Sequence, residues 1–245
     1  MDGSWLARTE LLIGAQGVAR LQAARVAVLG LGGVGAAAAE ALCRAGVGHL
    51  LLIDHDTVDL TNLNRQLFAT HDTVGLPKIE AARQRLHAIN PDGDLCYAAK
   101  FYLPQDSAFL YDWQPDYIVD AIDTVTAKLH LAQQAAARGL PLLSCMGTGN
   151  RLDPSQLRVG DLAQTASGCG CGLARVMRRE LRRRGIAHLQ VLYSLEQPQK
   201  VALSGANGRH VPGSIAFVPP AAGYLIASQV ARQLLQGCAA GVPSA

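Results

Sequence analysis

The residues best suited to chemistry lie in a glycine-rich turn and in the polar stretch that follows it. The turn carries Gly30, Gly32, Gly33 and Gly35 after an apolar run at 25–31, and it opens an alanine-rich segment at 33–46. Such glycines allow a tight turn in which backbone N–H groups at a helix start meet a phosphate. Asp54 ends the next apolar run, where an acid can accept hydrogen bonds from ribose hydroxyls. These features fit NAD and ATP equally well.

The polar stretch favours ATP. Asn62, Arg65 and Lys78 form a donor-rich set suited to a phosphate chain. Asp123 follows a later apolar run, at a strand end where open sheets bind ligands, and an aspartate there can hold Mg²⁺. Hydride transfer needs neither the phosphate cations nor the metal carboxylate. Each feature also has an interpretation without function. The glycine-rich turn could bind nothing, Arg65 could form a surface ion pair, and Lys78 could be a solvated residue in a first helical turn.

The segments GLGGVG, LIDHDTVDLTNLNRQ, VGLPK and VDAIDT together resemble the E1-like adenylating superfamily. The resemblance implies that a carboxylate attacks the α-phosphate of ATP, giving an acyl-adenylate and pyrophosphate. It places Asp54 on the ribose and Asp123 on magnesium. It also implies a homodimer in which Arg8 reaches into the partner's site. The cofactor contacts that it implies are Gly30, Gly32, Gly33, Gly35, Asp54, Asp56, Asn62, Arg65, Gln66, Lys78 and Asp123, with Arg8, Arg65, Lys78 and Asp123 in catalysis.

The second half of the chain indicates which branch of the superfamily the sequence resembles. Sulfur-carrier activators of the superfamily usually carry two Cys-x-x-Cys zinc pairs, and none of the six cysteines forms one: Cys43, Cys96, Cys145, Cys169, Cys171 and Cys238. SCMGTGNRLDP, ARVMRRELRRRGI and GSIAFVPPAAGYLIASQV resemble instead the tRNA threonylcarbamoyladenosine dehydratase branch. That branch adenylates N6-threonylcarbamoyladenosine at tRNA position 37, and the carbamoyl group then closes a cyclic oxazolone as AMP leaves. The branch also suggests a bound Na⁺ or K⁺, whose ligands the sequence does not identify.

An arginine-rich segment supports an RNA substrate independently. Arginine favours phosphate through its planar fork of donors, and the predicted tRNA contacts are Arg175, Arg178, Arg179, Arg182, Arg183 and Arg184. The alternative is a solvated charged helix face. Just before this segment the chain reads SGCGCG, where the branch usually has Asp-Pro. That departure puts the local turn, and any RNA contact that it makes, in question.

These residues need a framework of alternating strands and helices. Helices are expected at 8–24, 33–46, 73–90, 124–139 and 171–185, with Thr9 as a helix cap, and another after Pro219-Pro220. Apolar strands are expected at 25–31, 49–54, 94–100, 115–123 and 140–147, with two more at 151–162 and 188–198. This alternation predicts an α/β, Rossmann-like, mostly parallel sheet with helices on both faces and a C-terminal strand and helix extension. We expect one domain over 1–245, with an N-terminal helix at 1–24, an ATP-binding core at 25–150 and the extension at 151–245.

Bulk composition excludes few classes. A net charge of +3 over 245 residues does not by itself indicate nucleic acid. The N-terminus lacks the pattern of a signal peptide, and no apolar run is long enough to predict a membrane span. We therefore expect a cytoplasmic protein with mostly reduced, inert cysteines.

Three other functions stay open at this stage. The first is an E1-like adenylyltransferase that activates the C-terminus of a sulfur-carrier or ubiquitin-like protein. The others are a NAD(P)-dependent oxidoreductase and a nucleotide sensor without catalysis. The sequence does not say whether a sulfur-relay protein is a partner.

Overall fold

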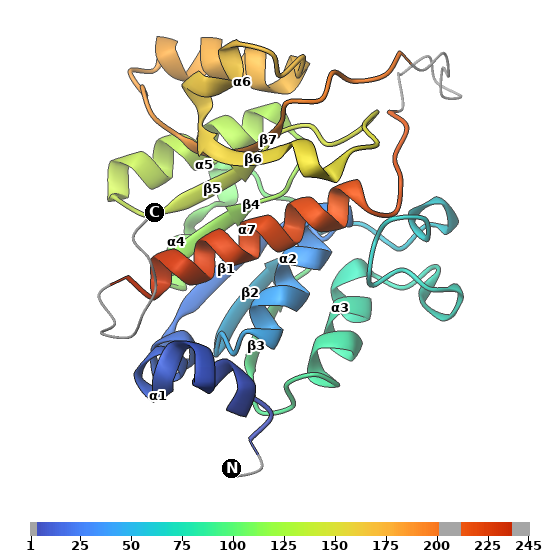
Figure 1. Cartoon of the computed structure of the whole chain (residues 1–245), viewed down its shortest axis with the longest axis vertical. Helices are drawn as coiled ribbons and strands as arrows, with labels where there is room; N and C mark the ends of the chain where they lie inside the picture. The colour runs from blue at the N-terminus through green and yellow to red at the C-terminus, as the bar shows by residue number, and fades with distance from the viewer. Residues whose placement is uncertain (1–3, 201–211, 237–245) are drawn as a thin grey trace.

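A single seven-stranded sheet organises the chain, of which the computed structural model describes residues 4–200 and 212–236. The strand order is β3-β2-β1-β4-β5-β7-β6, and only β6 runs antiparallel to its neighbour. The strands are β1 (Arg25–Leu29), β2 (His49–Ile53), β3 (Asp94–Ala98), β4 (Tyr117–Asp120), β5 (Leu142–Cys145), β6 (Leu157–Asp161) and β7 (Gln190–Ser194). The two strands of the C-terminal extension therefore complete the same sheet as the N-terminal core (Figure 1).

Helices cover both faces of the sheet, which confirms the predicted fold class. Those of the described residues are α1 (Ala7–Ala23), α2 (Gly33–Arg44), α3 (Lys78–His87), α4 (Ala108–Asp112), α5 (Val125–Arg138), α6 (Gly172–Arg183) and α7 (Val218–Leu234). The first three and α7 bury side chains in one apolar cluster, and α4, α5 and α6 do so in a second. None of these helices has the length and apolar character that crossing a membrane requires.

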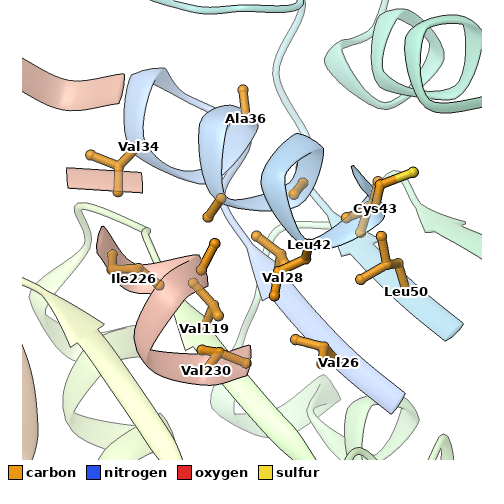
Figure 2. Packing of buried hydrophobic residues seen from close by; sticks show 14 of the residues in the cluster. Val26, Val28, Val34, Ala36, Leu42, Cys43, Leu50, Val119, Ile226 and Val230 are labelled. Atoms are coloured by element: carbon orange, nitrogen blue, oxygen red, sulfur yellow. The ribbon is translucent and has the colours of Figure 1, made fainter. Parts of the chain in front are cut away.

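Strands β1, β2, β4, β5 and β7 are mostly apolar because both of their faces are covered. Val26 and Val28 of β1 belong to the first cluster, whereas Ala27 and Leu29 belong to the second. This is the period of two expected of a strand buried on both sides. Figure 2 shows α2 above β1, with side chains of α7 beside Val119 of β4.

Small residues let α2 and α7 pack closely. A Cβ on Gly223 of α7 would lie 2.3 Å from the backbone oxygen of Val34 in α2. Helix α2 ends in a Schellman motif, in which Gly46 takes a φ of +90° and the Val47 N–H donates to the Leu42 oxygen at 3.1 Å. The predicted closure of this helix at Gly46 is confirmed.

Other predicted boundaries are wrong for local reasons. Helix α3 begins at Lys78, not at 73, because Gly75 has a φ of +87° and Pro77 at the N-cap has a non-helical ψ of 136°. Thr9 lies inside α1 and does not cap it, since that helix begins at Ala7. The short helix α4 was not predicted, and Pro219-Pro220 lie in the first turn of α7 instead of before it.

Candidate nucleotide site

A cavity of about 350 Å³ opens at the carboxyl ends of β1, β2 and β4. This edge is where open parallel sheets bind ligands. Most of the predicted nucleotide contacts line it together: Gly30, Gly32, Gly33, Asp54, Asp56, Asn62, Arg65, Gln66, Lys78 and Asp123. Gly35 and Arg8 do not line the cavity.

The glycines of the loop have different structural tasks. Gly30 has a φ of +87°, and a Cβ there would lie 2.8 Å from the backbone oxygen of Ala121. Gly35 lies within α2, where a Cβ would collide with the Gly30 oxygen at 1.7 Å. Gly32 has open space around its hypothetical Cβ and lines the cavity. Two glycines thus let the loop pack closely, and the third leaves room for a ligand at the start of α2.

The Asp54 carboxylate holds the backbone of the glycine-rich turn that follows β1. One carboxylate oxygen accepts the Leu31 N–H at 2.6 Å, and the other accepts the Asp56 N–H at 2.8 Å. The residue is only 7% exposed, so its carboxylate is held in one place. A carboxylate offers about four acceptor sites, which leaves capacity for ribose hydroxyls.

Lys78 enters the cavity from the first residue of α3. Its Nζ lies 2.8 Å from Asp56 Oδ2, and the residue is 8% exposed. Burial opposes ionisation of Asp56, but the Lys78 hydrogen bond and charge outweigh it and lower the pKa of Asp56. The ammonium group is thereby kept at the cavity wall with N–H donors to spare.

The polar segment after β2 forms a short 3₁₀ helix, η1 (Leu60–Asn62). The Asp59 side chain accepts the Thr61 N–H at 2.8 Å, and Asn62 Oδ1 accepts the Asp59 N–H at 3.2 Å. This capping box places Arg65 one turn later, where its Nη1 donates to the Thr61 oxygen at 3.0 Å. The asparagine and the arginine therefore belong to one locally folded unit.

Asp123 follows β4 on a loop that lines the cavity. It is exposed, and its carboxylate accepts a long hydrogen bond from Thr124 Oγ1 at 3.4 Å. Within residues 4–200 and 212–236, the one group of three or more carboxylates, histidines or cysteines close enough together to hold an ion is Asp54, His55 and Asp56. Asp123 does not belong to this group.

Several cavity residues were not predicted from the sequence. His55, Lys100, Phe101, Tyr102 and Thr124 also line it. The His55 and Phe101 rings meet edge to face, with centroids 4.6 Å apart. The rule about carboxyl strand ends could have found Lys100 and Phe101, because they follow β3.

Arg8 is an exposed residue of α1 and does not line the cavity of its own chain. The nearby Leu6 packs on Gly46, which ends α2 at the amino edge of the sheet. The cavity opens at the opposite, carboxyl edge. An ATP contact by Arg8 therefore requires a second copy of the chain.

The arginine-rich segment forms α6 over the sheet face that also carries α5. The helix buries Ala174, Met177 and Leu181, an i, i+3, i+7 stripe, and turns most arginines outward. Exposed arginines are Arg175, Arg179, Arg182, Arg183 and Arg184. Arg178 is half-buried and donates to Thr165 Oγ1.

The conformation of the SGCGCG turn before α6 depends on contacts made by its backbone. Gly170 has a φ of +59°, and a Cβ there would lie 2.7 Å from Pro198 Cδ. Arg151 donates to the Cys169 oxygen at 3.0 Å. The turn thus requires glycine at 170 for conformation and space.

The cysteines of the described residues are free thiols. Burial raises the pKa of Cys145 to about 12 and that of Cys43 to about 11. Neither residue lines the nucleotide cavity. Cys238 lies outside the described residues.

The fold and the cavity define a nucleotide-binding protein built on a Rossmann-like sheet, and sequence comparison identifies its family. The chain belongs to the ThiF family, whose model matches residues 6–239. It is 40% identical over 241 residues to the tRNA threonylcarbamoyladenosine dehydratase of Bacillus subtilis, covering 94% of each chain. The Escherichia coli protein of the same name is 40% identical over 157 residues, which are 64% of this chain and 59% of that protein.

Comparison with solved structures gives the same result as the sequence comparison. The crystal structure of Escherichia coli tRNA N6-threonylcarbamoyladenosine dehydratase, TcdA, with AMP has a TM-score of 0.85 at 30% identity and covers 93% of this chain and 92% of that one. The ATP complex of the same enzyme also has a TM-score of 0.85 at 30% identity, over 94% of this chain and 93% of that one. The resemblance to the E1-like superfamily and its dehydratase branch is confirmed, and the complexes support ATP as the nucleotide.

Proposed function

We propose that the protein is an ATP-dependent dehydratase that adenylates the carboxylate of N6-threonylcarbamoyladenosine at tRNA position 37 and closes it to the cyclic oxazolone form. The main support for this proposal is the cavity. It brings the glycine-rich turn, the buried acid Asp54, two cations suited to phosphate (Arg65 and Lys78) and Asp123 to one edge of the sheet. The family membership and the dehydratase relatives support it.

The chain's own residues bind and orient ATP. Asp54 accepts hydrogen bonds from the ribose, and the N–H groups at the start of α2 receive phosphate oxygens. Lys78 and Arg65 neutralise the phosphate chain while keeping their contacts to Asp56 and Thr61. The remaining cavity residues of the predicted set, Asn62 and Gln66, supply amide donors.

The residues present fit a magnesium ion. Asp123 lines the cavity with its carboxylate almost unengaged, and Mg²⁺ is commonly held by one or two carboxylates plus substrate phosphates. When bound there, the ion would neutralise charge on the phosphates and on the departing pyrophosphate. The Na⁺ or K⁺ ion stays a prediction without assigned ligands.

The reaction needs no protein nucleophile. A substrate carboxylate oxygen attacks the α-phosphorus, and the bond to pyrophosphate breaks. The carbamoyl group of the same nucleoside then attacks the activated carbon, releasing AMP and a proton. Ring closure within one molecule benefits from high effective concentration. Fixed cations at the phosphates stabilise the charge that develops in the first step.

The outer face of α6 is proposed to contact the tRNA backbone. Its exposed arginines project from one helix beside the SGCGCG turn. Such contacts position an RNA without reading its sequence.

A homodimer would complete the site. Leu11 and Leu12 of α1 are 76% and 81% exposed, an apolar surface close to Arg8 that a second copy could cover. We propose that Arg8 of one chain contacts ATP in the cavity of the other.

Mixing two inactive variants tests the shared site. An R8A protein and an R65A protein should each be inactive, but a mixed dimer contains one cavity with an intact Arg65 and an Arg8 from the other chain. Random exchange should restore about a quarter of wild-type turnover. No recovery after verified exchange would show that Arg8 does not act across a dimer.

Release of AMP tests the overall proposal. Mg·ATP is incubated with tRNA that carries threonylcarbamoyladenosine or lacks it, and nucleosides are analysed by mass spectrometry under mild conditions. We expect AMP release that depends on the modification, with loss of one water from the nucleoside. If the folded protein ignores that tRNA and instead exchanges pyrophosphate in the presence of a small protein ending in Gly-Gly, carrier adenylation is the better assignment.

A further inference from the structure

A fully buried ionic network lies behind the cavity. Lys128 of α5 places its Nζ 2.9 Å from Asp120 Oδ2 at the end of β4, and both side chains are 0% exposed. The same ammonium group donates to Ser144 Oγ of β5 at 3.1 Å and to the Cys145 backbone oxygen at 2.8 Å. Ser144 Oγ donates to Asp120 Oδ2 at 2.6 Å. Every charged atom thus has close partners.

Stability alone explains such a network poorly. Taking two charges out of water is costly, and well-packed apolar side chains of similar volume often stabilise a protein as much or more. Lys128 also interrupts the apolar face of α5 formed by Leu131, Ala132 and Ala135, three, four and seven residues later. The place of the network in the fold is therefore informative.

The network spans the loop that carries Asp123. Asp120 precedes this 121–124 loop, and its Oδ1 accepts the Ile122 N–H at 3.3 Å. At the other end, the Lys128 N–H donates to the Thr124 backbone oxygen at 3.0 Å. All four loop residues line the cavity.

The loop has little else to orient its carboxylate. The hydrogen bond from Thr124 to Asp123 is long, at 3.4 Å, and comes from the adjacent residue. The Ala121 backbone also packs directly against Gly30 of the glycine loop. A shift at Asp120 would therefore displace Asp123 relative to the phosphates.

We infer that Lys128, Asp120 and Ser144 are positioning residues that hold the 121–124 loop so that Asp123 faces the metal-bound triphosphate. None of the three side chains needs to touch ATP. The inference rests on the metal role proposed above for Asp123.

Comparing two ligands isolates this effect. AMP lacks the β- and γ-phosphates, so its binding depends little on Asp123, whereas Mg·ATP binding depends on it. Titration calorimetry on the D120N/K128M double variant, which removes both charges together, should show Mg·ATP affinity reduced about 10- to 100-fold, the usual loss when a residue that orients a metal ligand is changed. AMP affinity should change by no more than about twofold, because the glycine loop and Asp54 are intact.

Three further variants make the test decisive. S144A keeps the ion pair and should lower the Mg·ATP affinity relative to AMP in the same direction, by less; it decides the question if the double variant does not fold. E40Q alters another buried carboxylate, outside the cavity, and should leave the ratio of the two affinities unchanged. D123N should reproduce the loss seen in the double variant.

The inference would be overturned if a folded D120N/K128M protein had the wild-type ratio of Mg·ATP affinity to AMP affinity. If the double variant is unfolded, the same ratio measured in S144A decides. If D123N nevertheless shows the loss, the metal role of Asp123 stands. A wild-type ratio in D123N would overturn that role and the inference together. Dehydration of tRNA by the wild-type protein is measured separately, so failure of the proposed function is distinguished from both.

Discussion

The nucleotide cavity and the outer face of α6 both carry cationic side chains, but the two regions hold them differently. In the cavity, the Lys78 side chain is 10% exposed and fixed to Asp56. On α6, the Arg179 and Arg183 side chains are 62% and 69% exposed and share one acid, Glu180. The cavity wall thus presents a nearly buried charge held by one partner, and α6 presents a row of solvent-exposed charges.

This difference in exposure suits the two regions to different roles, stabilisation of a transition state in the cavity and binding of a polyanion on α6. Fixed charges shielded from water act strongly on charge that develops in a transition state. Exposed charges are screened by salt and contribute mainly to binding a polyanion. Changes in the cavity should therefore alter turnover, and changes on α6 should alter the apparent affinity for tRNA.

The largest expected effect is at Arg65. R65A should reduce kcat for AMP formation by about 10²- to 10³-fold, because a fixed donor to the phosphate chain is lost. Steady-state kinetics and a thermal melt would show the loss with the fold intact. R83A, which removes an exposed arginine paired with Glu80 on α3, is the matched control and should turn over normally. Normal turnover of R65A would contradict the cavity assignment.

Removing charge from α6 should change a different constant. The R182A/R183A variant should raise KM for tRNA about tenfold and leave KM for ATP unchanged, since two phosphate contacts are lost. Binding measured over a salt series should show the slope of log K against log salt reduced by about 2. An unchanged slope, or an equal loss of ATP binding, would mean that α6 does not contact the RNA backbone.

Glu40 provides a reference for charge burial outside both regions. Burial alone would raise its pKa, but Arg85 and Arg44 outweigh this and lower the pKa below its usual 4.5. Because the folded pKa is the lower one, this stabilisation is complete above about pH 4.5 and is lost as the pH falls through the folded pKa. E40Q should therefore cost about 1–2 kcal/mol of unfolding free energy at pH 7, a gap that narrows below pH 4.5. A gap of constant size across denaturation curves at several pH values would contradict this account.

The smallest expected effect is at Glu180. This carboxylate accepts from Arg179, Arg183 and Arg184, so it neutralises part of the α6 face. E180Q should tighten tRNA binding about two- to threefold, in keeping with the small energies of exposed ion pairs. Weaker binding on filter or fluorescence titration would show that Glu180 orders the arginines for RNA instead of competing for them.

The sequence predicted the part of the site that is local in the chain. Asp54 directly follows β2, and Asn62 and Arg65 are arranged by a short 3₁₀ helix with its cap within the next dozen residues. The parallel sheet was also predictable, because strands buried on both faces are mostly apolar along their length.

What depends on long-range packing was missed. Lys100 and Phe101 follow β3, so the rule about carboxyl strand ends makes them candidates, but only the pairing of β3 with β2 brings them to the cavity. Lys128 meets Asp120 and Ser144 where α5 lies over β4 and β5, so its partners are apparent only in the fold. The start of α3 was misplaced since Gly75 and Pro77 outweigh the apolar periodicity of the segment.

In the proposed reaction the substrate carboxylate attacks the α-phosphorus of ATP, and transfer of an isotope label from that carboxylate reports on this step. A tRNA whose threonylcarbamoyl carboxylate is ¹⁸O-labelled would be incubated with Mg·ATP and the enzyme, and the nucleotides would be analysed by mass spectrometry. We expect AMP carrying one ¹⁸O atom, because the carbon–oxygen bond breaks when the ring closes. Unlabelled AMP, or ADP with labelled phosphate, would contradict it.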